Sequence, residues 1–177
     1  NTAIGTFSLD ANTTASNNTA VGYSSLGANT TGTSNVGIGF EALASNTTAN
    51  NNTAVGRGTL GTNTTGDLNV AIGVGALGSS TASDRNVAIG KDAAAAYTQT
   101  GDNYMTVVGF GAAQNSTTAS QFTAIGALAL SGQTTANYNT AVGYFACAGA
   151  TTGSSNTAVG RSSQYANQTG GSNTSVG

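Results

Sequence analysis

A glycine that follows Val or Ile recurs along the whole chain at an almost constant interval. The glycines of this pattern are Gly5, Gly22, Gly39, Gly56, Gly73, Gly90, Gly109, Gly126, Gly143, Gly160 and Gly177. Nine of the ten intervals between them are 17 residues, and one is 19. A fixed period of this size, without the 3.6-residue spacing of an amphipathic helix, is typical of a chain that stacks one small unit on the next.

Each unit predicts one short strand. Written from its Asn, the unit reads roughly N-T-A-V-G-x-x-A-L-x-x-N-T-T-G-x-x, as in residues 18–34. Position 4 of the unit is always Val or Ile, and position 2 is always Thr or Val. Two β-branched residues separated by one residue point to the same face of a strand. The glycine at position 5 ends that strand where a side chain would clash or φ must be unusual.

The remaining apolar positions indicate how the unit packs. Position 3 is small in almost every unit, as at Ala20 and Gly37, with Val107 as the exception. We therefore expect another part of the protein to approach this face closely, or the face to be flat. A second apolar point follows at positions 8 and 9, as in Ala42 and Leu43. Equivalent residues of successive units form a column, which we call a file. We expect the Val/Ile file at position 4 and the Leu file at position 9 to form a dry spine, that is, an apolar core along the stack from which water is excluded.

Polar residues close each unit. Runs such as residues 29–32, Asn-Thr-Thr-Gly, suit a turn or an exposed corner. The two extra residues of the long interval fall around residues 101–103, which predicts a corner insertion. Asn recurs at position 1 in nine of eleven units, and Thr recurs at position 13 in nine of ten. Stacked Asn and Thr side chains can form hydrogen bonds along the axis of the stack.

These patterns predict an all-β fold, a parallel β-solenoid of about ten 17-residue coils. A helical unit is excluded by its glycines and β-branched residues, and collagen is excluded because Gly does not recur at every third residue. Coils stacked about 4.8 Å apart would form a rod on the order of 50 Å long. Residues 1–177 form a single array, and because this array starts and stops within the repeat, we expect a fragment of a longer fibrous protein.

Composition excludes several classes of function. Charged residues make up 6% of the chain, and there is no Pro, His or Trp. The four Lys and Arg residues are too few for a nucleic-acid interface. No apolar run reaches the roughly 18 residues of a membrane-spanning helix, so we expect no membrane insertion. The single Cys147 occupies a position that other units fill with Leu, which predicts a buried, inert thiol.

The chain offers little for catalysis or for cofactors. Its six acidic residues occupy different unit positions and do not recur as a pair, so we expect no enzyme, no catalytic residue and no cofactor. Asp84-Arg85 and Lys91-Asp92 are interpreted as exposed local ion pairs. Residues 101–103 are a faint candidate for a Ca²⁺ loop, but one carboxylate is too few, and the prediction is no metal site.

One chain on its own is poorly stabilised by this pattern. Each coil supplies about two large apolar side chains, which offset only part of the entropy lost by ordering 17 residues. The small residues at positions 3 and 8, with scattered Tyr and Phe, predict a second buried face shared between chains. We therefore expect a homo-oligomer, and we favour a parallel trimer around the long axis.

Aromatic residues at position 6 or 7 admit two interpretations. They could stack on the sugars of a host glycan, or they could pack at the seam between subunits, which is the favoured interpretation. The sequence assigns no ligand-binding residue. The aromatic residues concerned are Tyr23, Phe40, Phe110, Tyr144 and Phe145.

The unit resembles two related groups of sequences. The Asn-Thr-Ala-Val-Gly runs at 18–22, 139–143 and 156–160, and the Asn-Val-Ala-Ile-Gly runs at 69–73 and 86–90, resemble the signature of trimeric autotransporter adhesin heads. The longer unit is similar to repeats of phage tail-fibre and tail-spike proteins. The resemblance implies a left-handed parallel β-roll that assembles as a trimer. Adhesin repeats are usually nearer 14 residues, so this chain departs from them in length.

The sequence therefore favours a structural and adhesive segment of an extracellular fibre, either a phage tail fibre on a virion or an adhesin on a bacterial surface. Such a segment would provide a rigid shaft or head for attachment, and a host surface glycan or receptor could be its partner. Two alternatives stay open. One is a subunit of a self-assembling extracellular filament. The other is an ice-binding solenoid, for which Thr30, Thr47, Thr64, Thr81 and Thr98 form one file, although no Thr-x-Thr motif recurs.

Overall fold

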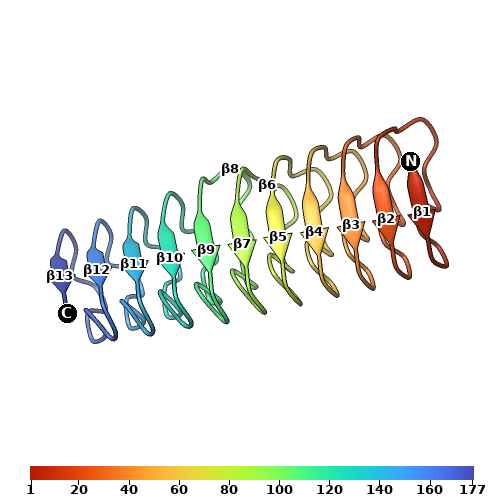
Figure 1. Ribbon diagram of the computed structural model, residues 1–177. Helices are drawn as coiled ribbons and strands as arrows, with labels where there is room; N and C mark the ends of the chain where they lie inside the picture. Colours follow the sequence, from red (N-terminus) through yellow and green to blue (C-terminus); the bar gives the residue numbers. More distant parts are fainter.

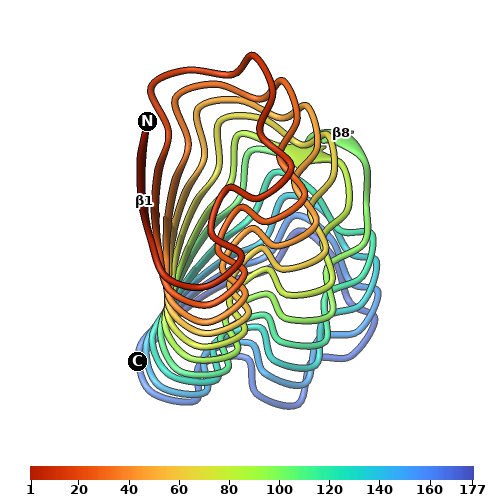
Figure 2. The ribbon, with the colours of Figure 1, turned by 90° about the vertical axis from the view of Figure 1, so that its right-hand side faces the viewer.

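The protein is a rod of stacked coils. The structure is a computed structural model that describes all residues, 1–177. The N-terminus lies at one end of the rod and the C-terminus at the other (Figure 1). Seen nearly along the rod, successive coils lie behind one another and follow the same path (Figure 2). The predicted all-β parallel solenoid of about ten coils, with no helix, is confirmed.

Eleven short strands, one from each unit, form a single parallel sheet. Their order in the sheet follows the chain, from β1 to β13 without β6 and β8. Equivalent residues pair in register, so that Thr19 lies beside Val36 and Val21 beside Ile38. The strands are β1 (Thr2–Ile4), β2 (Thr19–Val21), β3 (Val36–Ile38), β4 (Thr53–Val55), β5 (Val70–Ile72), β7 (Val87–Ile89), β9 (Thr106–Val108), β10 (Thr123–Ile125), β11 (Thr140–Val142), β12 (Thr157–Val159) and β13 (Thr174–Val176).

A second, smaller sheet marks the insertion. Strands β6 (Ser83–Asp84) and β8 (Gly101–Asp102) pair in parallel at one corner of the rod. The long unit re-enters the main sheet with Val87 beside Thr106, so the two extra residues are absorbed before β9 begins. The predicted corner insertion is confirmed (Figure 1).

Backbone hydrogen bonds join successive coils along almost their whole length. Of 116 backbone hydrogen bonds, only 21 lie within the strands, so the turns carry most of the ladder. For example, the Leu26 N–H donates to the Ala42 carbonyl at 3.0 Å, and the Thr30 N–H donates to the Thr47 carbonyl at 2.9 Å. This continuous ladder fixes the path of each coil on the coil before it.

The glycine at position 5 is required by both conformation and space. Gly39 has a φ of +134°, a region that L side chains rarely adopt. A Cβ atom at Gly39 would lie only 2.6 Å from the carbonyl oxygen of Gly56 in the next coil. Both reasons given by the sequence for this glycine are therefore confirmed.

The interior of each coil lies between position 3 on one wall and positions 8 and 9 on the other. The Leu residues at position 9 of the regular coils are fully buried, as is Ala54 at position 3. A Cβ atom at Gly37 would lie 2.7 Å from the Ser25 Oγ and 3.3 Å from the Leu26 Cγ. The close approach predicted from the small residues at position 3 is thus confirmed.

Two packing predictions are wrong. The Val/Ile file at position 4 does not join the dry spine, because its side chains point outward: Ile38, Ile72 and Ile125 are 38%, 38% and 39% exposed. The narrow interior accepts a small residue from the strand opposite Leu, and the alternation of the strand then directs its larger side chains to the outside. For the same reason, positions 3 and 8 are buried within one coil and cannot form a face shared between chains.

Candidate functional site

Two buried files of asparagine account for most of the polar interior. At position 1, the Asn52 N–H donates to the Asn35 Oδ1 at 3.0 Å, and the Asn35 Nδ2 donates to the Ala49 carbonyl at 2.7 Å. At position 12, the Asn46 Nδ2 donates to the Asn29 Oδ1 at 2.8 Å. The predicted hydrogen bonding along the axis is confirmed, and its main partners are backbone groups. These asparagines are structural.

The threonine file at position 13 is bonded to the protein in a similar way. The Thr30 Oγ1 donates to the Thr47 carbonyl at 3.0 Å, and the Thr47 Oγ1 donates to the Thr64 carbonyl at 3.1 Å. These hydroxyl protons are directed along the rod and are not free for an external ligand.

The charged side chains form one predicted ion pair and one that was not predicted. Lys91 Nζ lies 2.8 Å from Asp92 Oδ2, as expected. Arg85 does not pair with its neighbour Asp84 but with Asp102 in the next coil, and its guanidinium lies 6.0 Å from the centre of the Tyr104 ring. In a stack with coils about 4.8 Å apart, a residue of the next coil can be a nearer partner than an adjacent residue that points elsewhere.

The insertion at residues 101–103 is an ion-paired corner. The carboxylate of Asp102 accepts from Arg85 and from the Tyr104 hydroxyl, the latter at 3.1 Å, and Asn103 is buried. The structure brings together no group of three His, Cys, Asp or Glu residues that could hold a metal ion. Asp84 Oδ1 instead accepts from the Asp67 N–H at 2.7 Å, which is another bond between coils.

Cys147 lies in the core, as the sequence predicts. Its Sγ is 3.9 Å from the Gln164 Oε1 of the next coil. Burial raises the pKa of the Cys147 thiol and so disfavours the reactive thiolate.

The predicted aromatic residues lie along one edge of the rod, and all but Phe110 contact another ring; Phe110 instead lies 5.4 Å from Lys91 Nζ, measured to the centre of its ring. The Tyr23 and Phe40 rings are 5.3 Å apart and nearly parallel, while Phe7 meets Tyr23 edge-on at 5.6 Å. Tyr144 and Phe145 form a similar edge-on pair at 4.4 Å. In the stacked Tyr23–Phe40 pair, each ring covers one face of the other, so the space between the two rings is closed to a sugar.

The surface has one depression, which the sequence analysis did not identify. It is shallow and open, with a volume of about 470 Å³, and it forms where the alanine run at residues 93–96 leaves the corner of the rod unfilled. Its lining residues are Ser79, Asp92, Ala95, Ala96, Gln114 and Asn115.

The most extensive exposed feature is the outward side of the eleven-stranded sheet, which we call the outer sheet face. It is made by positions 2 and 4 of every unit, and each of these residues is Thr, Val or Ile. The position 4 side chains are half-buried or exposed in every strand. No partner within the chain covers them.

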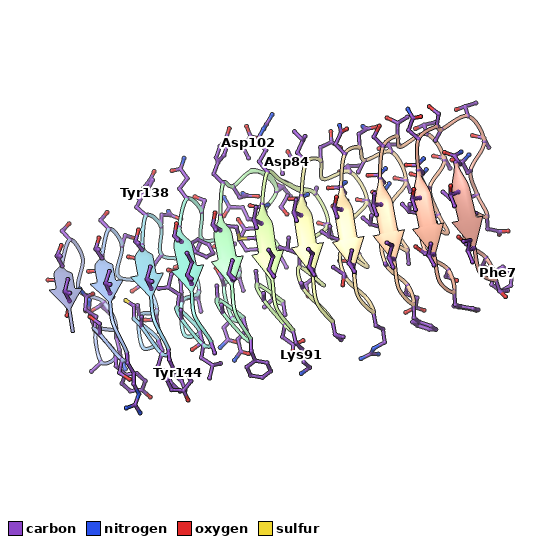
Figure 3. The ribbon with its side chains drawn as sticks, viewed as in Figure 1. Phe7, Asp84, Lys91, Asp102, Tyr138 and Tyr144 are labelled. Carbon is purple, nitrogen blue, oxygen red and sulfur yellow. The ribbon has the colours of Figure 1, made fainter.

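Two rows of side chains border the outer sheet face. The N-terminal rim comprises the residues at position 17, immediately before each strand's Asn position, with their position 16 neighbours and the insertion residue Asp102. The C-terminal rim comprises positions 6 and 7, immediately after each strand's glycine. Asp84, Asp102 and Tyr138 lie along one edge of the rod, and Phe7, Lys91 and Tyr144 lie along the opposite edge (Figure 3).

The structure contains no helix with the length and apolarity needed to cross a bilayer. Comparison with known proteins gives no match, whether to a family model, to a curated protein or to a solved structure.

Proposed function

We propose that the chain is a structural and adhesive segment of an extracellular fibre, assembled from parallel copies that bury their outer sheet faces together. The observation that carries this proposal is the outer sheet face itself, which is continuous along the rod and β-branched at every position. Beyond this face, the surface has exposed aromatic side chains along two edges of the rod, two ion pairs and one shallow depression.

The chemistry of the outer sheet face suits a permanent contact. Val, Ile and Thr have restricted χ1 rotamers, so packing them against a partner costs little side-chain entropy. Monomeric proteins rarely leave a contiguous apolar patch of more than a few hundred Å² in water. A stripe two residues wide and eleven strands long would be covered in full by the same stripe on other copies.

A trimer is the assembly that we favour. Three rods with their outer sheet faces directed inward would enclose a three-sided centre of Val, Ile and Thr side chains and leave the polar corners in solvent. The resemblance to adhesin heads and tail-fibre repeats supports this number of chains and a left-handed coil. It also supports a location outside the cell, on a phage virion or on a bacterial surface, with a host glycan or receptor as the object of attachment.

Stiffness is the mechanical property that such a shaft needs. The backbone bonds, the asparagine files and the Thr file all run parallel to the rod axis. Bending the rod would require many of them to lengthen together, so the arrangement favours a rigid spacer.

The test compares two aspartate substitutions on different surfaces of the rod. Ile72→Asp places a charge in the outer sheet face, and Thr65→Asp places the same charge at an exposed corner. We expect the parent to sediment as a trimer, Thr65→Asp to remain a trimer, and Ile72→Asp to dissociate while keeping its β-sheet circular dichroism. A monomeric parent contradicts the proposal, and a polymer of unlimited mass favours the filament alternative.

One observation favours ice binding as a second candidate, although on another surface than the sequence suggests. Threonine occupies position 2 in most strands of the outer sheet face, as at Thr123 and Thr140, and these hydroxyls form no hydrogen bond within the protein. A regular exposed array of Thr and Val could order water. Thermal hysteresis measured on the purified chain tests this candidate directly, and its absence would remove it.

A further inference from the structure

We infer that neighbouring copies meet rim to rim, with the N-terminal rim of one copy against the C-terminal rim of the next copy at the level of the same strand. The inference rests on the proposed homo-oligomer and specifies how its copies are oriented and how they are aligned along the axis.

In several strands, the residue just before the strand and the residue just after it have similar side chains. For each strand, we compare the residue at position 17 that precedes it with the residue at position 6 that follows it. The matched apolar pairs are Leu68 and Val74 for β5, Tyr104 and Phe110 for β9, and Tyr138 and Tyr144 for β11.

Strand β7 carries the charged counterpart of this match. It is preceded by Asp84-Arg85 and followed, after Gly90, by Lys91-Asp92. Each end therefore presents one acid and one cation, in opposite order along the chain. The position 17 and position 6 residues of this strand are both cations, Arg85 and Lys91, and the acids beside them, Asp84 and Asp92, supply the opposite charge on each rim.

The two members of a pair cannot meet within one chain. Five residues, most of them in the strand, lie between the two members, which would span roughly 20 Å if fully extended at about 3.3 Å per residue. The labelled residues lie on opposite edges of the rod (Figure 3). The large rim side chains are also exposed: Tyr138 is 59% exposed and Tyr144 47%.

A ring of parallel copies explains the match. When sheets related by rotation about the rod axis face inward, their strands run around the ring, so the end of each strand meets the start of the equivalent strand in the next copy. A two-fold axis perpendicular to the rod would instead bring each rim against itself. Rotation about the rod axis places Tyr138 beside Tyr144, and it places the rim with Asp84 and Arg85 beside the rim with Lys91 and Asp92.

The match also provides a reason for exact alignment along the axis. Most coils are nearly identical, so a slip of one copy by a whole coil would preserve the contacts of the outer sheet face. In the middle of the rod, the same slip would set a charged rim against an aliphatic or aromatic rim, which costs free energy. The remaining strands have a small or polar residue on at least one rim, as with Gln121 and Ala127 around β10, and so do not oppose a slip.

Cysteine cross-linking tests this arrangement. Cys147→Ala provides the parent background, because alanine already fills the same unit position at Ala94 and Ala113. In this background, Leu68→Cys with Val74→Cys, treated with a short bis-maleimide, is expected to yield covalent dimers and then a closed trimer on a denaturing gel. Each single variant alone is expected to stay monomeric on the gel, and a refolded mixture of the two single variants is expected to yield dimers.

The off-register control joins Leu68→Cys to Ala127→Cys, a C-terminal rim position three strands further along the sheet, and it should not link chains. Cross-linking of a single variant to itself, or equal linking by the control, overturns the inference. A parent that sediments as a trimer while the Leu68–Val74 pair gives no link also overturns it. A parent that sediments as a monomer instead overturns the proposed assembly itself. The mixture of single variants keeps the test decisive if the double variant fails to fold.

Discussion

The coils over residues 18–68 and the coils over residues 86–138 follow the same path with different interiors. In the first region, Asn fills positions 1 and 12 and Leu fills position 9. In the second region, Met105 and Phe122 replace Asn at position 1, and Tyr97 replaces it at position 12. The Leu position there becomes Ala94 and Ala113 in two coils, while the third coil keeps Leu130.

In the second region, the interior side chains fill a similar total volume, but the large side chains occupy other positions of the coil. Alanine at position 9 removes bulk from one wall, while Met105, Phe122, Tyr97 and Val107 restore it from other positions. All of these residues belong to the same buried cluster as the leucines. The coil therefore tolerates a change of interior as long as the enclosed space stays filled.

The two regions differ more in the hydrogen bonding of their buried polar side chains than in their packing. In the regular region, each buried asparagine has backbone or side-chain partners in its own coil or the next coil. The buried polar side-chain atoms without a partner all lie in the second region: Gln99 Oε1, Asn103 Oδ1, Ser116 Oγ and Gln133 Nε2. The comparison teaches that the backbone ladder and the position 5 glycines set the path, while the interior chemistry is replaceable.

Glycine substitution at position 5 should have the largest effect, and the effect should be alike in both regions. Gly39→Ala and Gly109→Ala each place a Cβ atom within 2.6 Å of the next coil at a φ of +134° or +141°. Backbone strain and overpacking together predict a loss of about 2–6 kcal/mol in unfolding free energy. Thermal or urea unfolding followed by circular dichroism measures it.

Gly58→Ala is the matched control, because Gly58 also has a positive φ but an added Cβ would meet nothing within 4 Å. We expect a loss of only about 1–2 kcal/mol there. A similar loss at all three sites would mean that close stacking of coils does not determine the path.

A larger side chain at position 9 of the second region should lower the unfolding free energy, unless a smaller residue at the facing position makes room for it. Position 3 of one coil contacts position 9 of the preceding coil, as Gly37 does with Leu26, so Val107 faces Ala94. Ala94→Leu should cost about 1–3 kcal/mol through overpacking. Adding Val107→Ala should recover most of that loss in thermal unfolding. A double variant less stable than Ala94→Leu would show that the two positions do not share the space.

Tyr97 should make the second region sensitive to alkali. Its hydroxyl donates to the Ala119 carbonyl at 2.8 Å, and burial raises the pKa of the phenol far above its ordinary value of about 10. The folded state then keeps a proton that the unfolded state releases, so stability is fully present below pH 10 and falls as the pH rises above it. The loss approaches about 1.4 kcal/mol per pH unit.

Tyr97→Phe should flatten this alkaline dependence between pH 10 and 11, at a cost of about 1 kcal/mol at neutral pH from the lost hydrogen bond. Urea unfolding across that range is the measurement. An unchanged slope in the variant would assign the alkaline loss to other groups.

The smallest expected effects come from replacing two buried serines by alanine, which should change the unfolding free energy in different directions. Ser25 Oγ donates to the Gly37 carbonyl at 2.7 Å, whereas Ser116 Oγ has no partner. Ser25→Ala should lower the unfolding free energy by about 1 kcal/mol, while Ser116→Ala should leave it unchanged or raise it. Equal losses in parallel unfolding curves would show that Ser116 has a partner after all.

Much of the fold could be predicted from the sequence, because the period alone determines which residues stack. The strand at positions 2 to 4, the position 5 glycine, the buried Leu file and the corner at residues 101–103 all follow from spacing. Which strand face points inward could not be derived from hydrophobicity. Ile72 is more apolar than Ala71, yet Ala71 is buried and Ile72 is exposed, because the leucines of the opposite wall leave room only for a small side chain.

The candidate surfaces were harder to predict for a related reason. Arg85 was assigned to its sequence neighbour Asp84, but in a solenoid the nearest partners are one coil away, and Arg85 pairs with Asp102. The outer sheet face emerged only after the inward face was known. The small residues at position 3 opposite Leu were the signal that could have assigned both faces.

The mass of the native particle tests the central claim most directly. Sedimentation equilibrium of the chain at micromolar concentration should give a single species of three 17.1 kDa chains, with the outer sheet faces buried between them. A folded species of one 17.1 kDa chain, with that face open to solvent, would contradict it.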